Sequence, residues 1–309
     1  MNLQSLIDQF IVYRQSLGEH WPSYCHLRGF GRFIGPDVEA ANVSPEQVNS
    51  FLVGAGPITL SWHIKLSVLR SFYQYAVSRG YVDKAPLPAI VPKRPPAFVP
   101  YVYSHDELAR LVQAAKSFER PSLGPGTLHL ILLLLYATGL RVGELLRLDR
   151  ADVNLPECLL KVRQSKFGKT RLVPFAPQLQ KVLLEHHNRD SASGERIPFI
   201  AMRSGGRLKA DTLHHSYRTL CAQIGISRAD GGRYQPRIHD LRHTFAVHRL
   251  TSWYRQGADV QKLLPLLSVY LGHVHIRATQ VYLSMTPELL EEAGNRFECY
   301  ATTKEAGRG

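Results

Sequence analysis

A proline-rich segment divides this chain into two parts. Residues 84–100 contain six prolines, namely Pro86, Pro88, Pro92, Pro95, Pro96 and Pro100. Proline lacks a backbone N–H and cannot continue a helix, and closely spaced prolines keep a chain extended. We therefore predict a semi-rigid linker over residues 84–100, an N-terminal domain over residues 1–83 and a C-terminal domain over residues 101–309.

The N-terminal domain has the sequence pattern of a four-helix unit. Its first helix carries apolar residues spaced three and four apart, at Leu3, Leu6, Ile7, Phe10 and Ile11. Further helices are expected over residues 24–34, from Pro45, and over residues 59–78. Ser44 and Gln47 form a capping-box pattern around the start of the third helix.

The C-terminal domain is predicted to be mainly helical with one small antiparallel sheet. Ser104 and Glu107 form a capping-box pattern that starts its first helix. Two strand-like runs, 159–163 and 170–175, are joined by a hairpin-type connection. The pattern of residues 197–202 also suits a strand. The remaining expected helices cover residues 127–137, 142–148, 211–224, 241–255, 260–269 and 287–301. The fold class is therefore mainly α with a small β-sheet (α+β).

The chain is strongly basic, and the excess is uneven. The formal net charge is +13 and the pI is about 9.7. Residues 1–100 carry 9 Lys and Arg against 6 Asp and Glu (net +3), whereas residues 101–309 carry 29 against 19 (net +10). Clustered Lys and Arg attract nucleic-acid phosphates, although a basic surface also suits acidic membranes. We expect the main phosphate-binding surface on the C-terminal domain.

Other features argue against several classes of protein. The four cysteines, Cys25, Cys158, Cys221 and Cys299, lie far apart and form no CxxC pair, so neither a metal site nor a redox motif is predicted. The N-terminus lacks the basic region and apolar run of a signal peptide. The apolar stretch Leu128–Ala137 is too short to span a bilayer. We expect a cytoplasmic protein without membrane contact.

Six residues of the C-terminal domain form an ordered set that suits one chemistry. In chain order they are Arg141, Lys166, His239, Arg242, His273 and Tyr282. Arg141 stands in the run Thr-Gly-Leu-Arg-Val-Gly-Glu, His239 opens His-Asp-Leu-Arg-His, and Leu-Gly-His273 precedes Tyr282 by nine residues.

Phosphoryl transfer through a tyrosine needs these residue types. Two arginines can hold the phosphate oxygens with paired donors, and such preorganised donors supply much of the catalysis. A phenol has a pKa of ~10, so Tyr282 needs a proton acceptor, which His239 can supply near neutral pH. The departing 5′-oxygen needs a proton, which Lys166 on a hairpin can deliver. Guanidinium and ammonium groups stabilise the charge, so no metal or other cofactor is expected.

On these motifs the chain resembles the tyrosine recombinase (phage integrase) family, nearest in style to the bacterial Xer-type enzymes. The resemblance covers residues 104–282. The N-terminal unit resembles, more weakly, the family's SAM-like core-binding domain. Such enzymes clamp DNA between the two domains. They break and rejoin DNA site-specifically, in integration, excision or transposition.

The resemblance implies a role for each residue of the set. Tyr282 would form a 3′-phosphotyrosyl link, and Arg141 and Arg242 would bind the scissile phosphate. Lys166 would be the general acid, His239 the general base, and His273 a donor to a phosphate oxygen. Glu144, three residues after Arg141, would support the catalytic residues without contacting the DNA itself.

The resemblance also implies partners. These are double-stranded DNA with paired recognition sites and further copies of the chain, as a tetramer on DNA, with or without a related recombinase. An acidic helix from Pro287 would dock on a neighbouring protomer, the alternative being packing within its own chain. One departure is that His273 stands 31 positions after Arg242, several more than in the Xer pattern.

Several assignments have a competing interpretation. Lys169 competes with Lys166 for the acid role, Tyr270 is the nearest rival nucleophile, and Arg141 could simply pair with Glu144. The expected DNA contacts are Lys65, Arg70, Lys169, Arg171, Arg203 and Arg207, each of which could instead be an ordinary solvated charge. Contacts to the phosphate backbone would position the protein without reading sequence.

Two other functions compete with recombination. A type IB topoisomerase-like enzyme would use the same nucleophile without strand exchange, and a binding-only protein would keep the fold without the chemistry. The Xer-like spacing argues against the first, and the complete six-residue set argues against the second.

Overall fold

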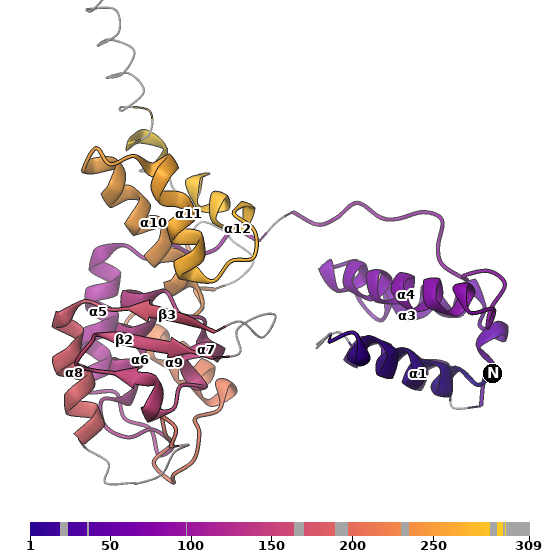
Figure 1. The fold of residues 1–309 in the computed structure, drawn as a ribbon, viewed down its shortest axis with the longest axis horizontal. Helices are drawn as coiled ribbons and strands as arrows, with labels where there is room; N and C mark the ends of the chain where they lie inside the picture. The colour runs from indigo at the N-terminus through magenta and orange to yellow at the C-terminus, as the bar shows by residue number, and fades with distance from the viewer. Residues whose placement is uncertain are drawn as a thin grey trace, which may run out of the picture. The chain divides into compact units, whose positions relative to one another are not determined.

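The chain folds as two units with separate hydrophobic cores (Figure 1). The computed structural model describes residues 1–18, 24–35, 37–96, 98–163, 170–188, 197–229, 235–284, 289–292 and 294. Contacts divide the chain into Met1–Phe98 and Val99–Gly309. Residues 84–96 form neither helix nor strand, but Ala85 and Leu87 pack against the core of the first unit.

In its described residues the N-terminal unit has four α-helices, α1 (Leu3–Ser16), α2 (Tyr24–Ile34), α3 (Pro45–Val53) and α4 (Leu60–Ser78), and a short 3₁₀ helix, Ala40–Asn42. The side chain of Asn2 caps α1, and the expected capping box of Ser44 and Gln47 starts α3. The apolar faces meet in an aromatic core around Phe10, Phe30 and Phe72, each at most 1% exposed. The four-helix prediction is confirmed for this unit.

The C-terminal unit has two lobes, each with its own hydrophobic core. The first lobe contains a three-stranded antiparallel sheet. Its helices are α5 (His105–Lys116), α6 (Thr127–Thr138), α7 (Val142–Leu146), α8 (Pro177–Asn188) and α9 (Ala210–Gln223). The strands β1 (Val153–Asn154), β2 (Leu159–Val162) and β3 (Arg171–Pro174) pair in that order, with Leu160 opposite both Val153 and Val173. α6 is apolar on all sides because it runs through the core.

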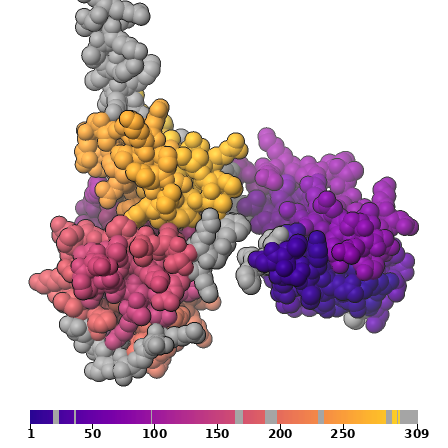
Figure 2. All heavy atoms as spheres, viewed as in Figure 1, coloured from indigo at the N-terminus to yellow at the C-terminus, as the bar shows by residue number. Residues whose placement is uncertain are grey.

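The second lobe carries the C-terminal motifs. It contains α10 (Asp240–Arg255), α11 (Val260–Leu271), the short α12 (Arg277–Gln280) and a 3₁₀ turn, Val281–Ser284. In Figure 2 these segments, orange to yellow, lie directly on the first lobe of the same unit. The long Arg242–His273 spacing is taken up by four turns of α10 and by α11, which contains Pro265.

The structure differs from the sequence-based expectation at several elements. Residues 197–202 form only isolated bridges, because Pro198 lacks an N–H and the pairing partner changes along the segment. Strand β1 and helices α8 and α12 were not expected. Of the predicted helix 287–301, residues 289–292 are helical, and most of the rest lies outside the described residues.

No helix in the described part of the chain has both the length and the apolar character needed to cross a membrane.

Candidate active site

Arg141 is placed by the sharp turn between α6 and α7. α6 ends at Gly139, which adopts the left-handed conformation (φ 61°). A Cβ there would lie 2.5 Å from the ring of Phe245, so the chain passes too close for any other residue. The carboxylate of Glu144 accepts hydrogen bonds from the backbone N–H (3.0 Å) and Nη1 (2.7 Å) of Arg141.

Glu144 is a buried carboxylate shared by two arginines. Its side chain is 2% exposed, and Arg171 donates to both of its oxygens, at 3.0 and 2.8 Å. Burial raises the pKa of Glu144, but the hydrogen bonds and charges of Arg171 and Arg141 outweigh burial and hold the pKa at about 2. Glu144 is therefore ionised at neutral pH.

Three guanidiniums bind consecutive carbonyls at the C-terminal end of α11. The bonds are Arg171 Nε to Tyr270 O (3.0 Å), Arg242 Nη2 to Leu271 O (2.6 Å) and Arg141 Nη2 to Gly272 O (3.1 Å). The last carbonyls of a helix lack partners within the helix and carry the negative end of its dipole. This contact brings three distant segments to the Leu-Gly-His turn.

Gly272 allows this packing. It caps α11 in the left-handed conformation (φ 69°), and a Cβ would lie 2.8 Å from Nη1 of Arg171. We expect Gly272→Ala to lower the free energy of unfolding by more than Gly257→Ala, which changes a glycine of the same φ with open space around it. Backbone strain alone costs about 1–2 kcal/mol. Urea unfolding of both variants measures the excess, and equal losses would contradict the steric role of Arg171.

Arg242 is buried beside the same turn. It is 3% exposed, and Nη1 donates to the carbonyl of Gly139 at 2.6 Å. Burial and the nearby charge of Arg141 lower the pKa of Arg242 to about 10, so the guanidinium remains charged.

Asp240 fixes the start of α10. It is fully buried in the first turn of this helix, and its carboxylate accepts hydrogen bonds from the backbone N–H and the guanidinium of Arg237.

Tyr282 lies beside this cationic cluster, in the 3₁₀ turn after α12. It is 3% exposed and belongs to the core of the second lobe. Burial raises the pKa of Tyr282, while the charges of Arg242 and Arg141 and a hydrogen bond from Arg242 act in the opposite direction. The phenol proposed as nucleophile is thus next to both predicted phosphate-binding arginines.

Two histidines flank the Tyr282 ring. The ring centroid of His273 lies 6.1 Å away in a stacked arrangement, and its Nδ1 contacts the hydroxyl of the buried Thr279 at 2.7 Å. The ring centroid of His243 lies 5.5 Å from that of Tyr282 and 5.3 Å from that of His239. His243 thus packs against both Tyr282 and His239.

Four partly buried histidines predict a pH-dependent stability. Burial, followed by nearby positive charge, lowers the pKa of His239, His243, His248 and His273 to about 4. The unfolded chain, with a His pKa of about 6.5, therefore binds more protons between pH 6.5 and 4. The free energy of unfolding should be fully retained above pH 6.5 and fall as the pH drops towards 4.

Denaturant unfolding at half-unit pH steps checks this expectation. His248→Gln, a change at a site away from Tyr282, should reduce the slope between pH 6.5 and 4.5. A stability that stays flat in the wild type over this range would contradict the assignment.

Three cations expected on the DNA surface have partners within the protein. Arg171 is 13% exposed and is bound to Glu144 and Tyr270, and its contact with a DNA phosphate stays a prediction. Lys65 donates to the carbonyl of Phe51 at 2.7 Å and lies over its ring, and Arg207 binds Asp149 and two backbone carbonyls. The sequence could not show these partners because each is distant along the chain.

The other expected cations are found elsewhere. Arg70 and Arg203 are exposed. Lys166 and Lys169 lie outside the described residues, so the choice of general acid stays a prediction. Sequence reasoning missed the structural role of Arg171, the contact of Thr279 with His273, and the position of His243 against Tyr282; the only sequence signal for His243 was its place directly after Arg242.

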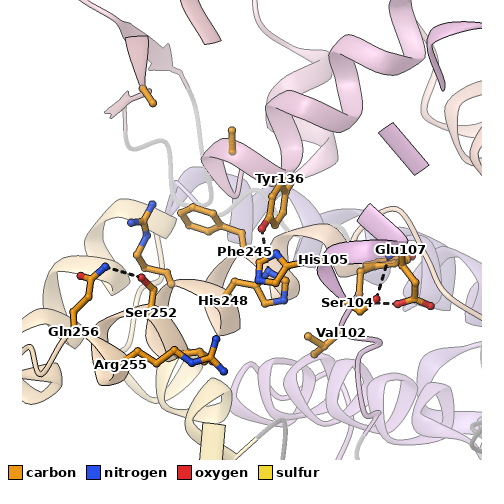
Figure 3. Close-up of a pocket in the computed structure, with 15 residues that line it drawn as sticks. Val102, Ser104, His105, Glu107, Tyr136, Phe245, His248, Ser252, Arg255 and Gln256 are labelled. Atoms are coloured by element: carbon orange, nitrogen blue, oxygen red, sulfur yellow. Dashed lines mark hydrogen bonds between the residues drawn. The ribbon is translucent and has the colours of Figure 1, made fainter. Parts of the chain in front are cut away.

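A cavity of about 910 Å³ lies apart from this cluster, between α5, α6 and α10. Figure 3 shows His105, His248 and Tyr136 grouped in this cavity. The ring centroids of His105 and His248 are 4.2 Å apart, and the Tyr136 hydroxyl lies 3.0 Å from Nδ1 of His248. None of the five predicted catalytic residues that the structure describes lines this cavity. The described residues also contain no cluster of three or more His, Cys, Asp or Glu arranged for a metal ion.

Comparisons with known proteins agree with this geometry. The integrase/recombinase y4rB of Sinorhizobium fredii is 37% identical over 77% of this chain and 78% of its own length. The tyrosine recombinase XerC of Thermodesulfovibrio yellowstonii is 29% identical over 83% and 84%. A lambda integrase tetramer bound to a Holliday junction has the same fold, with a TM-score of 0.64 at 21% identity over 89% of this chain and 78% of that one.

The family match covers the whole region that builds the cluster. Residues 102–288 match the phage integrase family. Arg141, His239, Arg242, His273 and Tyr282 all fall within this range. The chain therefore belongs to the phage integrase family, whose members are tyrosine-type enzymes that cut and rejoin DNA site-specifically.

Proposed function

We propose that Tyr282 is the nucleophile and that Arg141 and Arg242 hold the scissile phosphate. Attack of the Tyr282 oxygen on phosphorus forms a 3′-phosphotyrosyl link and releases a 5′-hydroxyl. His273, oriented by Thr279, donates to a phosphate oxygen. Lys166 supplies the proton to the leaving 5′-oxygen. An imidazole at the start of α10, that of the predicted general base His239 or of its neighbour His243, accepts the proton of Tyr282. Exposed cations, Arg70 and Arg203 among them, contact the DNA backbone.

The balance of charge at the site is the observation that supports this assignment most strongly. Arg141, Arg171 and Arg242 bring three positive charges around a single carboxylate, Glu144, which leaves a net charge of +2. Like charges in a partly buried site repel one another, and the repulsion contributes to the lowered pKa of Arg242. A bound phosphodiester removes this repulsion, and the negative charge that develops on its oxygens is stabilised further.

A nicked DNA substrate tests this function. A nick placed just beyond the cleavage site lets the short product diffuse away, so the protein–DNA adduct accumulates. We expect a covalent adduct with the wild type and none with Tyr282→Phe, whereas Tyr270→Phe keeps the reaction. A wild-type protein that binds the site without forming an adduct would support the binding-only alternative.

We further propose that the active assembly is a tetramer of this chain on two paired DNA sites, alone or with a related recombinase, in the cytoplasm. The fold shared with the lambda integrase tetramer supports this assembly. In this proposal, the acidic C-terminal segment reaches a neighbouring protomer. Within the chain, Leu289 is fully buried and Glu292 pairs with Arg255, so residues up to this point also anchor the segment to its own subunit.

Deleting residues 295–309 should therefore weaken tetramer assembly more than binding to a single site. The truncation keeps both anchors, Leu289 and Glu292, so the fold of the second lobe is retained. Native gel shifts with one-site and two-site DNA measure the two equilibria. Equal loss of both complexes would contradict a role in subunit contacts.

A further inference from the structure

His243 occupies the place between the nucleophile and the histidine predicted as general base. Its ring centroid is 5.5 Å from that of Tyr282 and 5.3 Å from that of His239. Because His239 and His243 are separated by one turn of α10, they stand on the same side of the helix. From this side of α10, the imidazole of His243 packs against the Tyr282 ring.

A ring nitrogen of His243 is buried without a partner. Nδ1 is inaccessible to solvent and forms no hydrogen bond within the described residues. A buried polar atom left unsatisfied costs about 1–3 kcal/mol. Such a cost is often found where a polar group serves the chemistry of a site.

The charges around His243 keep its imidazole neutral and able to accept a proton. Burial lowers its pKa to about 4, and His239, Arg237 and Arg242 act in the same direction, whereas Asp240 opposes them. A neutral imidazole offers one nitrogen as an acceptor. A DNA phosphate bound by Arg141 and Arg242 brings negative charge close by, which favours the protonated imidazole at the moment of reaction.

We propose that His243 is the catalytic residue that accepts the proton of Tyr282, an assignment that rests on the proposed tyrosine nucleophile. As the Tyr282 oxygen bonds to phosphorus, its O–H bond breaks and the proton moves to a ring nitrogen of His243. The bond from phosphorus to the 5′-oxygen breaks with its electron pair, and this oxygen takes a proton from the general acid. During rejoining a 5′-hydroxyl attacks phosphorus and its O–H proton returns to the general acid. The bond from phosphorus to the Tyr282 oxygen breaks with its electron pair, and this oxygen regains the proton from His243. His239 remains free to donate to a phosphate oxygen.

The test compares rates of adduct formation on the nicked substrate, at saturating enzyme, for wild type, His243→Phe and His248→Phe. Phenylalanine keeps a flat ring but removes the acceptor. His248 is a matched control because it lies on α10, has a similarly lowered pKa, and contacts Tyr136 and His105 instead of Tyr282. General acid–base groups typically contribute about 10²–10⁴-fold in rate. We expect a loss of about 100-fold or more for His243→Phe and a change within about threefold for His248→Phe.

A second comparison separates proton transfer from packing. A fluorinated tyrosine incorporated at position 282 has a lower phenol pKa and depends less on a proton acceptor. We expect it to restore at least about tenfold of the rate lost in His243→Phe, with little gain in the wild-type background. Thermal melting and DNA binding establish that each variant is folded, and His243→Gln replaces His243→Phe if the latter fails to fold.

Two outcomes would overturn the assignment. One is a folded His243 variant that forms adduct at nearly the wild-type rate. The other is a rate loss of the same size with tyrosine and with fluorinated tyrosine, which would make His243 a packing residue. Both differ from failure of the proposed nucleophile, in which the wild type itself forms no adduct through Tyr282.

Discussion

Replacing Arg242 by glutamine is expected to slow DNA cleavage by about 10³-fold or more. Arginines that stabilise the transition state of phosphoryl transfer contribute about 10³–10⁵-fold. Two N–H groups of Arg242 are already held by the carbonyls of Gly139 and Leu271, and the guanidinium acts on the phenol of Tyr282, whose pKa it lowers. The guanidinium is thus preorganised beside the nucleophile. Glutamine keeps a polar side chain but carries no charge and has fewer donors.

The measurement is the single-turnover rate of adduct formation at saturating enzyme. Arg249→Gln is the matched control, since Arg249 is an exposed cation on the same helix. Arg242→Lys should also be strongly impaired, because one ammonium group cannot reproduce the fixed fork of donors. A rate for Arg242→Gln within about tenfold of the wild type, in a folded protein, would contradict the role of Arg242 at the phosphate.

Replacing Glu144 by glutamine should reduce the free energy of unfolding by about 3–5 kcal/mol, the usual cost of breaking a buried ion pair by removing one partner. Glu144 is the carboxylate that forms ion pairs with both Arg141 and Arg171. Without it, two guanidiniums are left close together with no counterion, and the contact between β3 and the end of α11 loses its anchor. The expected effect therefore includes a slower cleavage reaction as well as lower stability.

Urea unfolding measures the loss, and Asp106→Asn provides the comparison. Asp106 pairs with Arg110 at the surface, with side chains 82% and 48% exposed, and such exposed pairs contribute only about 0–1 kcal/mol. If Glu144→Gln cost no more than Asp106→Asn, Glu144 would not be the electrostatic centre of the site.

The sequence predicted what depends on local interactions. The helices that begin at Pro45 and His105 were located because capping boxes and apolar spacing act within a few residues. The hairpin of β2 and β3 was located by its strand-like runs and intervening turn. Their order and surrounding motifs also identified five residues that the structure places around one cluster, because each stands in a short, recognisable sequence run.

What depends on long-range contacts was not predictable in this way. Arg171 was expected on the surface, yet its partners Glu144 and Tyr270 are 27 and 99 residues away. The contact of Arg141 with Gly272 spans 131 residues. The predicted catalytic set did not include His243, since nothing in the sequence shows that its ring meets that of Tyr282. Such contacts depend on how the two lobes pack against each other. Apolar spacing predicts which face of a helix is buried, but it does not show which residues of another element that face contacts.

The identity of the residue that carries DNA after cleavage is the most direct test of the proposed mechanism. The adduct trapped on a nicked substrate can be digested with nuclease and protease, and the modified peptide sequenced by mass spectrometry. We predict a nucleotide joined through its 3′-phosphate to Tyr282, and no modified peptide from Tyr282→Phe. A nucleotide on Tyr270, whose hydroxyl donates to the carbonyl of Pro174, or on any other residue would contradict it.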